Sequence, residues 1–256
     1  MPQPAPSKAP RCPLCRKPTA PLGAVDFNRS CAEAQGLRLP PANRPVAYVQ
    51  CRTCGFAFAP MFQDWTAADF AREIYNAGYG AVDPDHKEVR PRANAQTILG
   101  MFPGAARPAR HLDYGGGAGR MSELLRAAGW DSACYDPFFD GDKSAEPAGT
   151  YSLITCFEVF EHVTDPRALA ATLDRLLAPD GLMLVSTLVS DGNLAPGRPL
   201  TWWYAAPRNG HVSLYARTSL DRLATRQGWR FASFSPESHV FWRGEFPAFA
   251  RHLLAR

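Results

Sequence analysis

Hydrophobic residues in the second half of the chain fall into short continuous runs, separated by segments in which apolar positions recur every three or four residues. The runs predict buried strands at 109–114, 131–135, 151–157, 182–187, 229–234 and 238–243. The recurring segments predict helices at 120–128, 166–177 and 219–227. Strands and helices that alternate at these lengths indicate an α/β fold with a doubly wound, mostly parallel sheet.

Helix-capping residues indicate where several of these helices begin. Asp165 and Thr218 are predicted N-caps of the helices that follow them, because their side chains can accept hydrogen bonds from a first helical turn. Earlier in the chain we expect one helix over 66–80, capped by its first threonine, and another over 91–102, opened by its proline.

The segment 1–60 lacks long periodic patterns and is rich in proline and cysteine. We expect residues 1–10 to be a disordered tail and residues 11–60 to be a small metal-stapled module. Residues 61–104 are then a helical linker or lid, and residues 105–256 form the α/β domain.

Composition narrows the class of protein. Hydrophobic residues make up 46% of the chain, enough for a real core, and no apolar run reaches the length of about 20 residues that spans a bilayer. The start lacks the apolar core of a secretion signal, so we expect a cytoplasmic protein without a membrane partner. Residues 1–60 carry a net charge of +6 and the remainder −2, out of +4 overall. That balance permits an anionic partner without demanding one.

A glycine-rich turn follows the first predicted strand of the α/β domain. Gly115, Gly117 and Gly119 stand between this strand and the next helix, where glycine lets the backbone turn tightly and approach a ligand. Asp136 ends the following strand, where a carboxylate can accept hydrogen bonds from both ribose hydroxyls of an adenosine. Asp113, just before the glycines, would repel a pyrophosphate but suits a cationic methionyl group.

On HLDYGGGAGR and YDP the sequence resembles the class I methyltransferases over about residues 105–243. The resemblance implies a Rossmann-like sheet with an antiparallel last strand and S-adenosyl-L-methionine as cofactor. Asp113 and the three glycines would line the methionine and ribose side, with Asp136 on the ribose. The chain departs from the family at Ser152, where many members have Asp.

The segment TCFEVFEHV follows the strand at 151–157, at the end of the sheet where ligands bind. On a helical turn Glu158, Glu161 and His162 would share one face, where they could hold a divalent cation or act as acid–base groups. Equally, Glu158 could cap a helix and His162 could bond a buried carbonyl.

This segment closely resembles the ubiquinone-pathway O-methyltransferases, whose E-x-x-E-H pattern is used with magnesium. The resemblance implies Mg²⁺ on Glu158, Glu161 and His162, and Phe157 against the adenosine. It also implies an arginine for the methionine carboxylate, for which Arg92 is the best placed, with Arg90 only two residues away.

The stretch 199–217 is rich in aromatic residues and lies after a predicted strand, also at the ligand end. Trp202, Trp203, Tyr204 and Tyr215 are expected to contact an acceptor as part of a lid, and His211 is a candidate general base. The alternative is a surface loop that packs its own aromatic side chains.

Two C-x-x-C pairs predict a structural Zn²⁺ site: Cys12 with Cys15, and Cys51 with Cys54. Four thiolates leave no open coordination position, and a pair of redox dithiols is the alternative. Cys31 is expected to be spare. The module resembles the N-terminal zinc modules of sugar C-methyltransferases, although their larger C-terminal domain has no counterpart here. It also resembles the zinc finger of some ribosomal-RNA guanine methyltransferases.

Together these patterns predict an S-adenosylmethionine-dependent methyltransferase that acts on a small-molecule acceptor, at oxygen. His162 and His211 are the candidates for acceptor chemistry. The alternatives are an RNA methyltransferase guided by its zinc module, an enzyme like the sugar C-methyltransferases, and a zinc adaptor whose cofactor domain has lost catalysis. The oligomeric state does not follow from the sequence.

Overall fold

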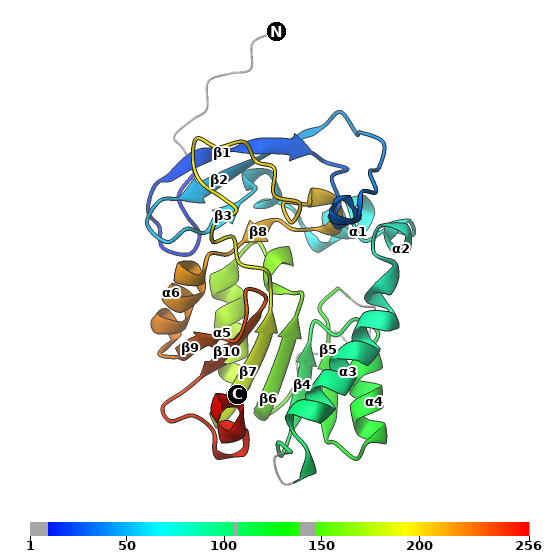
Figure 1. Cartoon of the computed structure of the whole chain (residues 1–256), viewed down its shortest axis with the longest axis vertical. Coiled ribbons are helices and arrows are strands. Elements are labelled where there is room, and N and C mark those ends of the chain that lie inside the picture. Colours follow the sequence, from blue (N-terminus) through cyan, green and yellow to red (C-terminus); the bar gives the residue numbers. More distant parts are fainter. Residues whose placement is uncertain (1–9, 105–106, 139–146, 256) are drawn as a thin grey trace.

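The computed structural model describes residues 10–104, 107–138 and 147–255. Figure 1 shows a large sheet flanked by helices, with a smaller sheet lying across one end of it. The large sheet has the order β5-β4-β6-β7-β10-β9. Its strands are β4 (His111–Tyr114), β5 (Ser132–Tyr135), β6 (Tyr151–Phe157), β7 (Leu177–Ser186), β9 (Arg230–Ser233) and β10 (Ser238–Trp242).

The direction of the strands confirms the predicted sheet. The strands β4, β5, β6 and β7 are parallel, and β10 runs antiparallel between β7 and β9. The helices packed on this sheet are α3 (Val89–Met101), α4 (Arg120–Ala127), α5 (Pro166–Leu176) and α6 (Arg217–Gln227). The predicted doubly wound fold with an antiparallel last strand is therefore confirmed.

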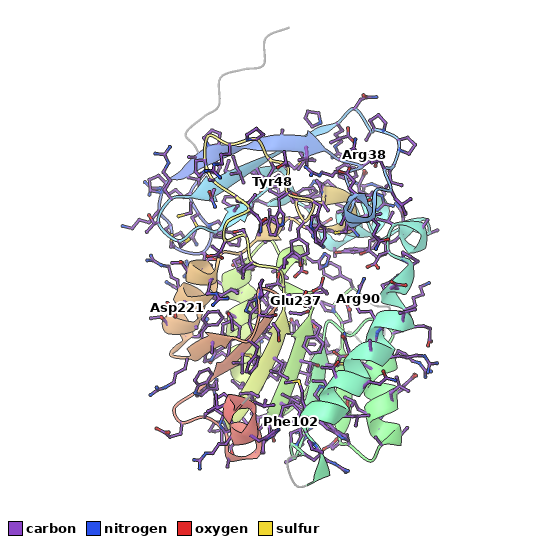
Figure 2. All side chains as sticks on the ribbon, in the orientation of Figure 1. Arg38, Tyr48, Arg90, Phe102, Asp221 and Glu237 are labelled. Atoms are coloured by element: carbon purple, nitrogen blue, oxygen red, sulfur yellow. The ribbon has the colours of Figure 1, made fainter. Side chains whose placement is uncertain are left out.

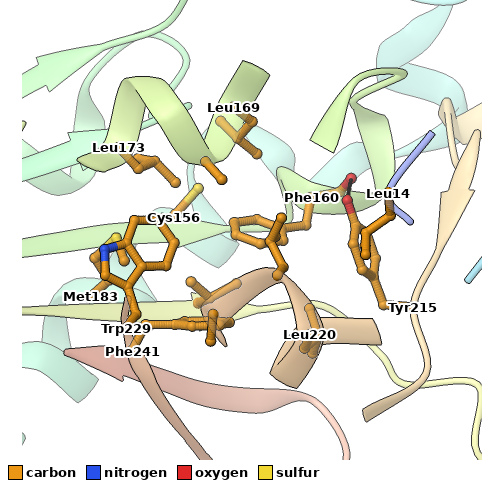
Figure 3. Packing of buried hydrophobic residues seen from close by; sticks show 14 of the residues in the cluster. Leu14, Cys156, Phe160, Leu169, Leu173, Met183, Tyr215, Leu220, Trp229 and Phe241 are labelled. Carbon is orange, nitrogen blue, oxygen red and sulfur yellow. Dashed lines mark hydrogen bonds between the residues drawn. The ribbon is translucent and has the colours of Figure 1, made fainter. Parts of the chain in front are cut away.

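Both faces of the sheet are buried, because neighbouring residues on each strand point to opposite sides. In β7, Leu182 and Leu184 pack with α3 and α4, whereas Met183 and Val185 pack with α5 and α6. The short helix η8 (Ala248–Ala255) adds to the first of these cores. Figure 3 shows the second core, in which side chains of α5 and α6 meet those of the strands.

The smaller sheet has the order β1-β2-β3-β8. Its strands are β1 (Thr19–Asp26), β2 (Pro45–Cys51), β3 (Ala57–Phe58) and β8 (Ser213–Leu214). Because β8 comes from the stretch that follows β7, the N-terminal module and the α/β domain share one sheet. Leu14 also packs in one core with Phe160 and Tyr215 (Figure 3). The domain boundaries stay a prediction, and the tail at 1–9 lies outside the described residues.

Short helices lie in the segments that link these elements. They are η1 (Cys31–Gln35), η2 (Pro60–Phe62), α1 (Ala67–Glu73), α2 (Tyr79–Val82), η3 (Pro84–His86), η6 (Phe160–His162) and η7 (Pro207–Asn209). The single helix predicted over 66–80 is wrong after α1: Asn76 hydrogen-bonds Arg72 O and Gly78 N through its side chain and turns the chain. Its N-cap is confirmed, because Thr66 and Asp69 form a capping box.

The N-caps of the two later helices differ. Asp165 accepts hydrogen bonds from Arg167 N and Ala168 N, as predicted. Thr218 is not a cap: α6 begins one residue earlier, and Asp191 Oδ2 accepts from Arg217 N at 2.7 Å. The cap is therefore supplied by a loop distant in sequence. Among the described residues, no helix combines the length and apolarity needed to cross a bilayer.

Candidate functional site

The predicted glycine turn lies where β4 meets α4. Gly115, Gly117 and Gly119 have φ angles of 78°, 55° and 85°, a region that glycine enters without strain. A Cβ on Gly115 would lie 2.3 Å from the Val159 side chain, whereas nothing lies within 4 Å of a Cβ on Gly117. The side of Gly117 on which a Cβ would lie is therefore open, as a ligand-binding turn requires.

Asp136 lies across this turn, at the end of β5. Its Oδ2 accepts a hydrogen bond from Gly117 N at 2.9 Å, and its Oδ1 accepts one from Phe138 N at 2.8 Å. The structure thus brings together the glycine turn and the acid that the sequence places at the end of the following strand. The carboxylate and the glycine turn therefore lie side by side at the ends of β4 and β5.

Asp113 supports the turn from inside the fold. Its side chain is buried, accepts a hydrogen bond from Thr155 Oγ1 at 3.2 Å, and lies so near Gly116 that a Cβ there would be 2.3 Å from Asp113 Oδ2. Burial, reinforced by the charge of Asp136, raises the pKa of Asp113 to about 7. Contact between Asp113 and a cofactor stays a prediction.

The two candidate arginines differ in their surroundings. Arg92 is half-exposed on α3 and pairs with Glu88 at 3.0 Å. Arg90 is held by both carboxylate oxygens of Asp83, at 2.7 and 3.1 Å. Burial raises the pKa of Glu158, and the charge of Arg90 offsets part of that rise. Figure 2 shows Arg90 at the end of α3 that is nearer the smaller sheet. Arg90 is therefore the arginine nearer the ligand end.

The E-x-x-E-H segment does not form one helical turn. Glu158 has a φ of 53° and is tied to the end of β7, where Ser186 Oγ donates to Glu158 Oε1 at 3.0 Å. Helical structure begins only at Phe160, so the prediction that Glu158 shares a helical face with Glu161 and His162 is wrong. Phe157, at the end of β6, is partly buried against the core that α3 and α4 cover.

Two groups of metal-ligating side chains have ligand atoms within 4.8 Å of one another among the described residues. One is the predicted set of four cysteines. The other consists of Glu161, His162 and His211, and Glu158 belongs to neither. No finding supports magnesium on Glu158, Glu161 and His162, and that assignment stays a prediction.

Both histidines of the second group are held by main-chain oxygens. His162 Nδ1 lies 3.1 Å from Gly210 O and 3.0 Å from Tyr75 Oη, and His211 Nδ1 lies 2.9 Å from Tyr204 O. Because a carbonyl oxygen can only accept, these contacts favour the tautomer with the proton on Nδ1 and the lone pair on Nε2. Burial lowers the pKa of His162 to about 4 and that of His211 well below its usual value, so both rings are neutral.

An aromatic wall joins these histidines to the cofactor end. Tyr75 packs on Tyr79 and on Phe138, with ring centroids 5.1 and 5.8 Å apart, and its own ring lies 6.2 Å from that of His162. Phe138 follows Asp136 closely in the chain and is 51% exposed. Sequence reasoning missed Tyr75 and Tyr79, and their helical spacing in the predicted lid was the only signal.

The predicted aromatic lid is wrong for most of its members. Trp202, Tyr204 and Tyr215 are buried in the two cores that meet at the smaller sheet. Their large apolar rings gain more from packing there than from exposure in a loop. Of these four residues only Trp203 is partly exposed, and Tyr204 lies against His211 with ring centroids 4.2 Å apart.

The four cysteines meet at the edge of the smaller sheet. The sulfur atoms of Cys12 and Cys54, Cys15 and Cys51, and Cys15 and Cys54 are 3.8, 3.4 and 3.6 Å apart. A tetrahedral site with Zn–S bonds of about 2.3 Å places sulfur atoms about 3.8 Å apart. Each pair sits in the same turn, closed by Arg16 N to Cys12 O and by Gly55 N to Cys51 O. The donor set and its spacing therefore fit zinc.

Comparison with known proteins agrees with this geometry. The fold and the glycine turn with its acid define a methyltransferase-type nucleotide-binding domain. Residues 86–233 match the family model described as "Methyltransferase domain", and the chain belongs to this family. The predicted family is thereby confirmed.

Curated relatives are ubiquinone biosynthesis O-methyltransferases. The protein from Xanthomonas oryzae pv. oryzae (strain PXO99A) is 45% identical over 47 residues, 18% of this chain and 20% of the relative. That from Caulobacter sp. (strain K31) is 32% identical over 102 residues, 31% of this chain and 40% of the relative. The alignments thus span less than half of either relative's length.

Among solved structures, the chain is similar in fold to the 1,6-didemethyltoxoflavin-N1-methyltransferase of Burkholderia thailandensis, which was crystallised with 1,6-didemethyltoxoflavin and S-adenosylhomocysteine. The TM-score is 0.50 at 17% identity, over 80% of this chain and 96% of that one.

Proposed function

We propose that this protein is an S-adenosyl-L-methionine-dependent methyltransferase that acts on a small-molecule acceptor, at oxygen. The observation that carries the proposal is the carboxylate of Asp136 bonded to the open peptide of Gly117. In a methyltransferase-family chain, this is the arrangement that can exchange a main-chain partner for the hydroxyls of an adenosine ribose.

The cofactor residues follow from their places around the turn. Gly115, Gly117 and Gly119 allow close approach of the ligand, and Asp136 accepts from the ribose. Asp113 holds the turn from beneath. For the methionine carboxylate we favour Arg90 over Arg92, because Arg90 is near enough to Glu158 to lower its pKa, whereas Arg92 lies on the surface with Glu88. Phe157 is retained as a candidate contact with the adenosine.

A small acceptor suits the space beside the cofactor end. Tyr75, Tyr79 and Phe138 form a wall that would pack against a planar molecule, and His162 stands at its far end. The names of the curated relatives favour oxygen as the methylated atom. In the reaction the sulfonium S–CH₃ bond breaks, an O–CH₃ bond forms and the acceptor hydroxyl loses its proton.

What the protein must supply is alignment and a place for that proton, because the sulfonium is already activated. His162 and His211 are the residues for the acceptor step, since each keeps an Nε2 lone pair. The four cysteines hold a structural zinc ion, which stabilises the sheet that β8 completes. This sheet fixes the loop that carries His211.

A tritiated-methyl assay tests the proposal. Catechols, other phenols, nucleotide-sugars and RNA are offered in turn with labelled S-adenosylmethionine. We expect label in a hydroxylated small molecule. Label in RNA alone would overturn the proposed acceptor class, and label in a sugar carbon would overturn methylation at oxygen. Label in none of them, from protein that binds no S-adenosylhomocysteine, would overturn the proposal itself.

A further inference from the structure

Three polar side chains from two distant segments meet beneath the smaller sheet. Glu161 and His162 belong to η6, whereas His211 comes much later in the chain, just before β8. Their ligand atoms lie within 4.8 Å of one another, although nothing in the local sequence pattern links residue 211 to the other two.

The histidines are fixed in the form that a metal ion requires. Each points Nδ1 at a main-chain carbonyl, and a metal-bound imidazole usually donates its other nitrogen to such an acceptor. The carbonyl of His211 is itself held by the Tyr48 hydroxyl at 2.6 Å. Gly210 leaves no room for a side chain, since a Cβ would lie 2.9 Å from His162 Nδ1.

Glu161 carries an unmet bonding requirement. The residue is fully buried, and the Tyr204 hydroxyl donates to its Oε1. Its Oε2 is buried without a hydrogen-bond partner, as is Thr187 Oγ1. An acceptor oxygen in this position is costly unless a proton or a cation satisfies it.

We infer that Glu161, His162 and His211 form a site for a divalent transition-metal ion of the zinc, cobalt or iron(II) class. Two imidazole nitrogens and one carboxylate oxygen suit these ions, whereas magnesium prefers oxygen ligands alone. The site therefore differs from the magnesium triad that the E-x-x-E-H resemblance implies, because it leaves out Glu158.

Three protein ligands leave coordination positions open, in contrast to the four-cysteine site. Resting on the proposed function, this inference gives the open position to the acceptor hydroxyl. Coordination would lower the pKa of that hydroxyl, so that its proton could pass to solvent while His162 and His211 hold the ion.

Metal titration of the full chain tests the site. Protein stripped with chelator is titrated with Co²⁺ by visible absorption, and zinc content is measured after Zn²⁺ loading. We expect two ions per chain: one with the strong absorption of a tetrathiolate and one with the weak bands of a nitrogen–oxygen site. Glu161→Gln and His211→Gln should each bind one ion, and His252→Gln, a histidine bonded to Met101 O far from the site, should bind two. Mg²⁺ should not displace the second ion.

One ion per wild-type chain would overturn the inference, and so would a second ion that both ligand variants keep. Binding of S-adenosylhomocysteine by a variant shows that the variant has folded. If a variant does not fold, the number of ions bound per wild-type chain still tests the inference. Methyl transfer by protein with one ion would sink the second site and leave the proposed function standing. Two ions per chain without methyl transfer to any acceptor would support the second site and count against the proposed function.

Discussion

The two ends of the proposed pocket are built in opposite ways. The cofactor end is almost continuous in sequence: the turn at 115–119 and Asp136 lie on neighbouring strands. The acceptor end gathers Tyr75, His162 and His211 from separate segments, and the N-terminal module holds the last of them in place. Changes at the cofactor end should therefore affect cofactor affinity alone, whereas changes in the module should reach the acceptor step.

The largest effect should come from Cys54→Ser, which removes one ligand of the four-cysteine site. Because the small sheet is stapled by this ion and shares β8 with the α/β domain, we expect loss of the zinc and of methyl transfer. The melting temperature should fall by about 10 °C, equivalent to about 3 kcal/mol. Metal analysis measures the zinc content and calorimetry the melting temperature. Cys31→Ser is the matched control and should keep the zinc. Retained zinc and an unchanged melting temperature in Cys54→Ser would contradict the structural role.

Asp136→Ala should act at the cofactor end only. Losing a charged acceptor for two hydroxyls costs about 3 kcal/mol, so S-adenosylhomocysteine affinity should fall about 100-fold. Titration calorimetry measures the affinity, and the Co²⁺ count should not change. Glu237→Gln, a surface change beyond β9, is the matched control. Equal affinity in Asp136→Ala and wild type would remove Asp136 from the ribose.

Tyr48→Phe should act at the acceptor end from a distance. The variant leaves the buried carbonyl of His211 without its donor, so we expect a fall in kcat of about tenfold. S-adenosylhomocysteine affinity should stay as in the wild type, because Tyr48 makes no contact with the glycine turn. A loss of cofactor affinity equal to the loss of kcat would break the proposed separation of the two ends.

A further effect concerns stability in mild acid. His111, beneath the cofactor end, is buried between Ser132 Oγ and Thr155 Oγ1, and burial lowers its pKa to about 3. The folded state holds the neutral ring, so this stability is complete above pH 6.5 and is lost as pH falls towards 3. At pH 5 the loss is about 2 kcal/mol. Urea unfolding at pH 7 and pH 5 measures this loss. Between these two pH values the free energy of unfolding should fall less in His111→Gln than in the wild type, and equal falls in the two proteins would contradict the prediction.

Local signals explain what could be predicted from the sequence. The alternation of strands and helices, the glycine turn, Asp136 and the two C-x-x-C pairs each depend on neighbours at short range in the chain, and the structure places them together. The capping box at Thr66 and the cap at Asp165 are local in the same sense.

Long-range packing explains the rest. The shared strand β8, the partnership of His211 with Glu161, and Asp191 as a cap for α6 join segments with no common pattern. The sequence predicted a lid at Trp202 and Tyr204 because aromatic residues at the ligand end can either contact a ligand or pack in a core. Only the position of the smaller sheet shows that these two are core residues. Glu158 left the expected helical face because a single residue with positive φ breaks the turn.

The central claim is that the turn at 115–119 and Asp136 bind an adenosyl sulfonium compound. Calorimetric titration of the wild-type chain with S-adenosylhomocysteine and, separately, with a nicotinamide dinucleotide tests it most directly. The account predicts saturable binding of one S-adenosylhomocysteine per chain and no heat from the dinucleotide. Binding of the dinucleotide, or no binding of either ligand by folded protein, would contradict it.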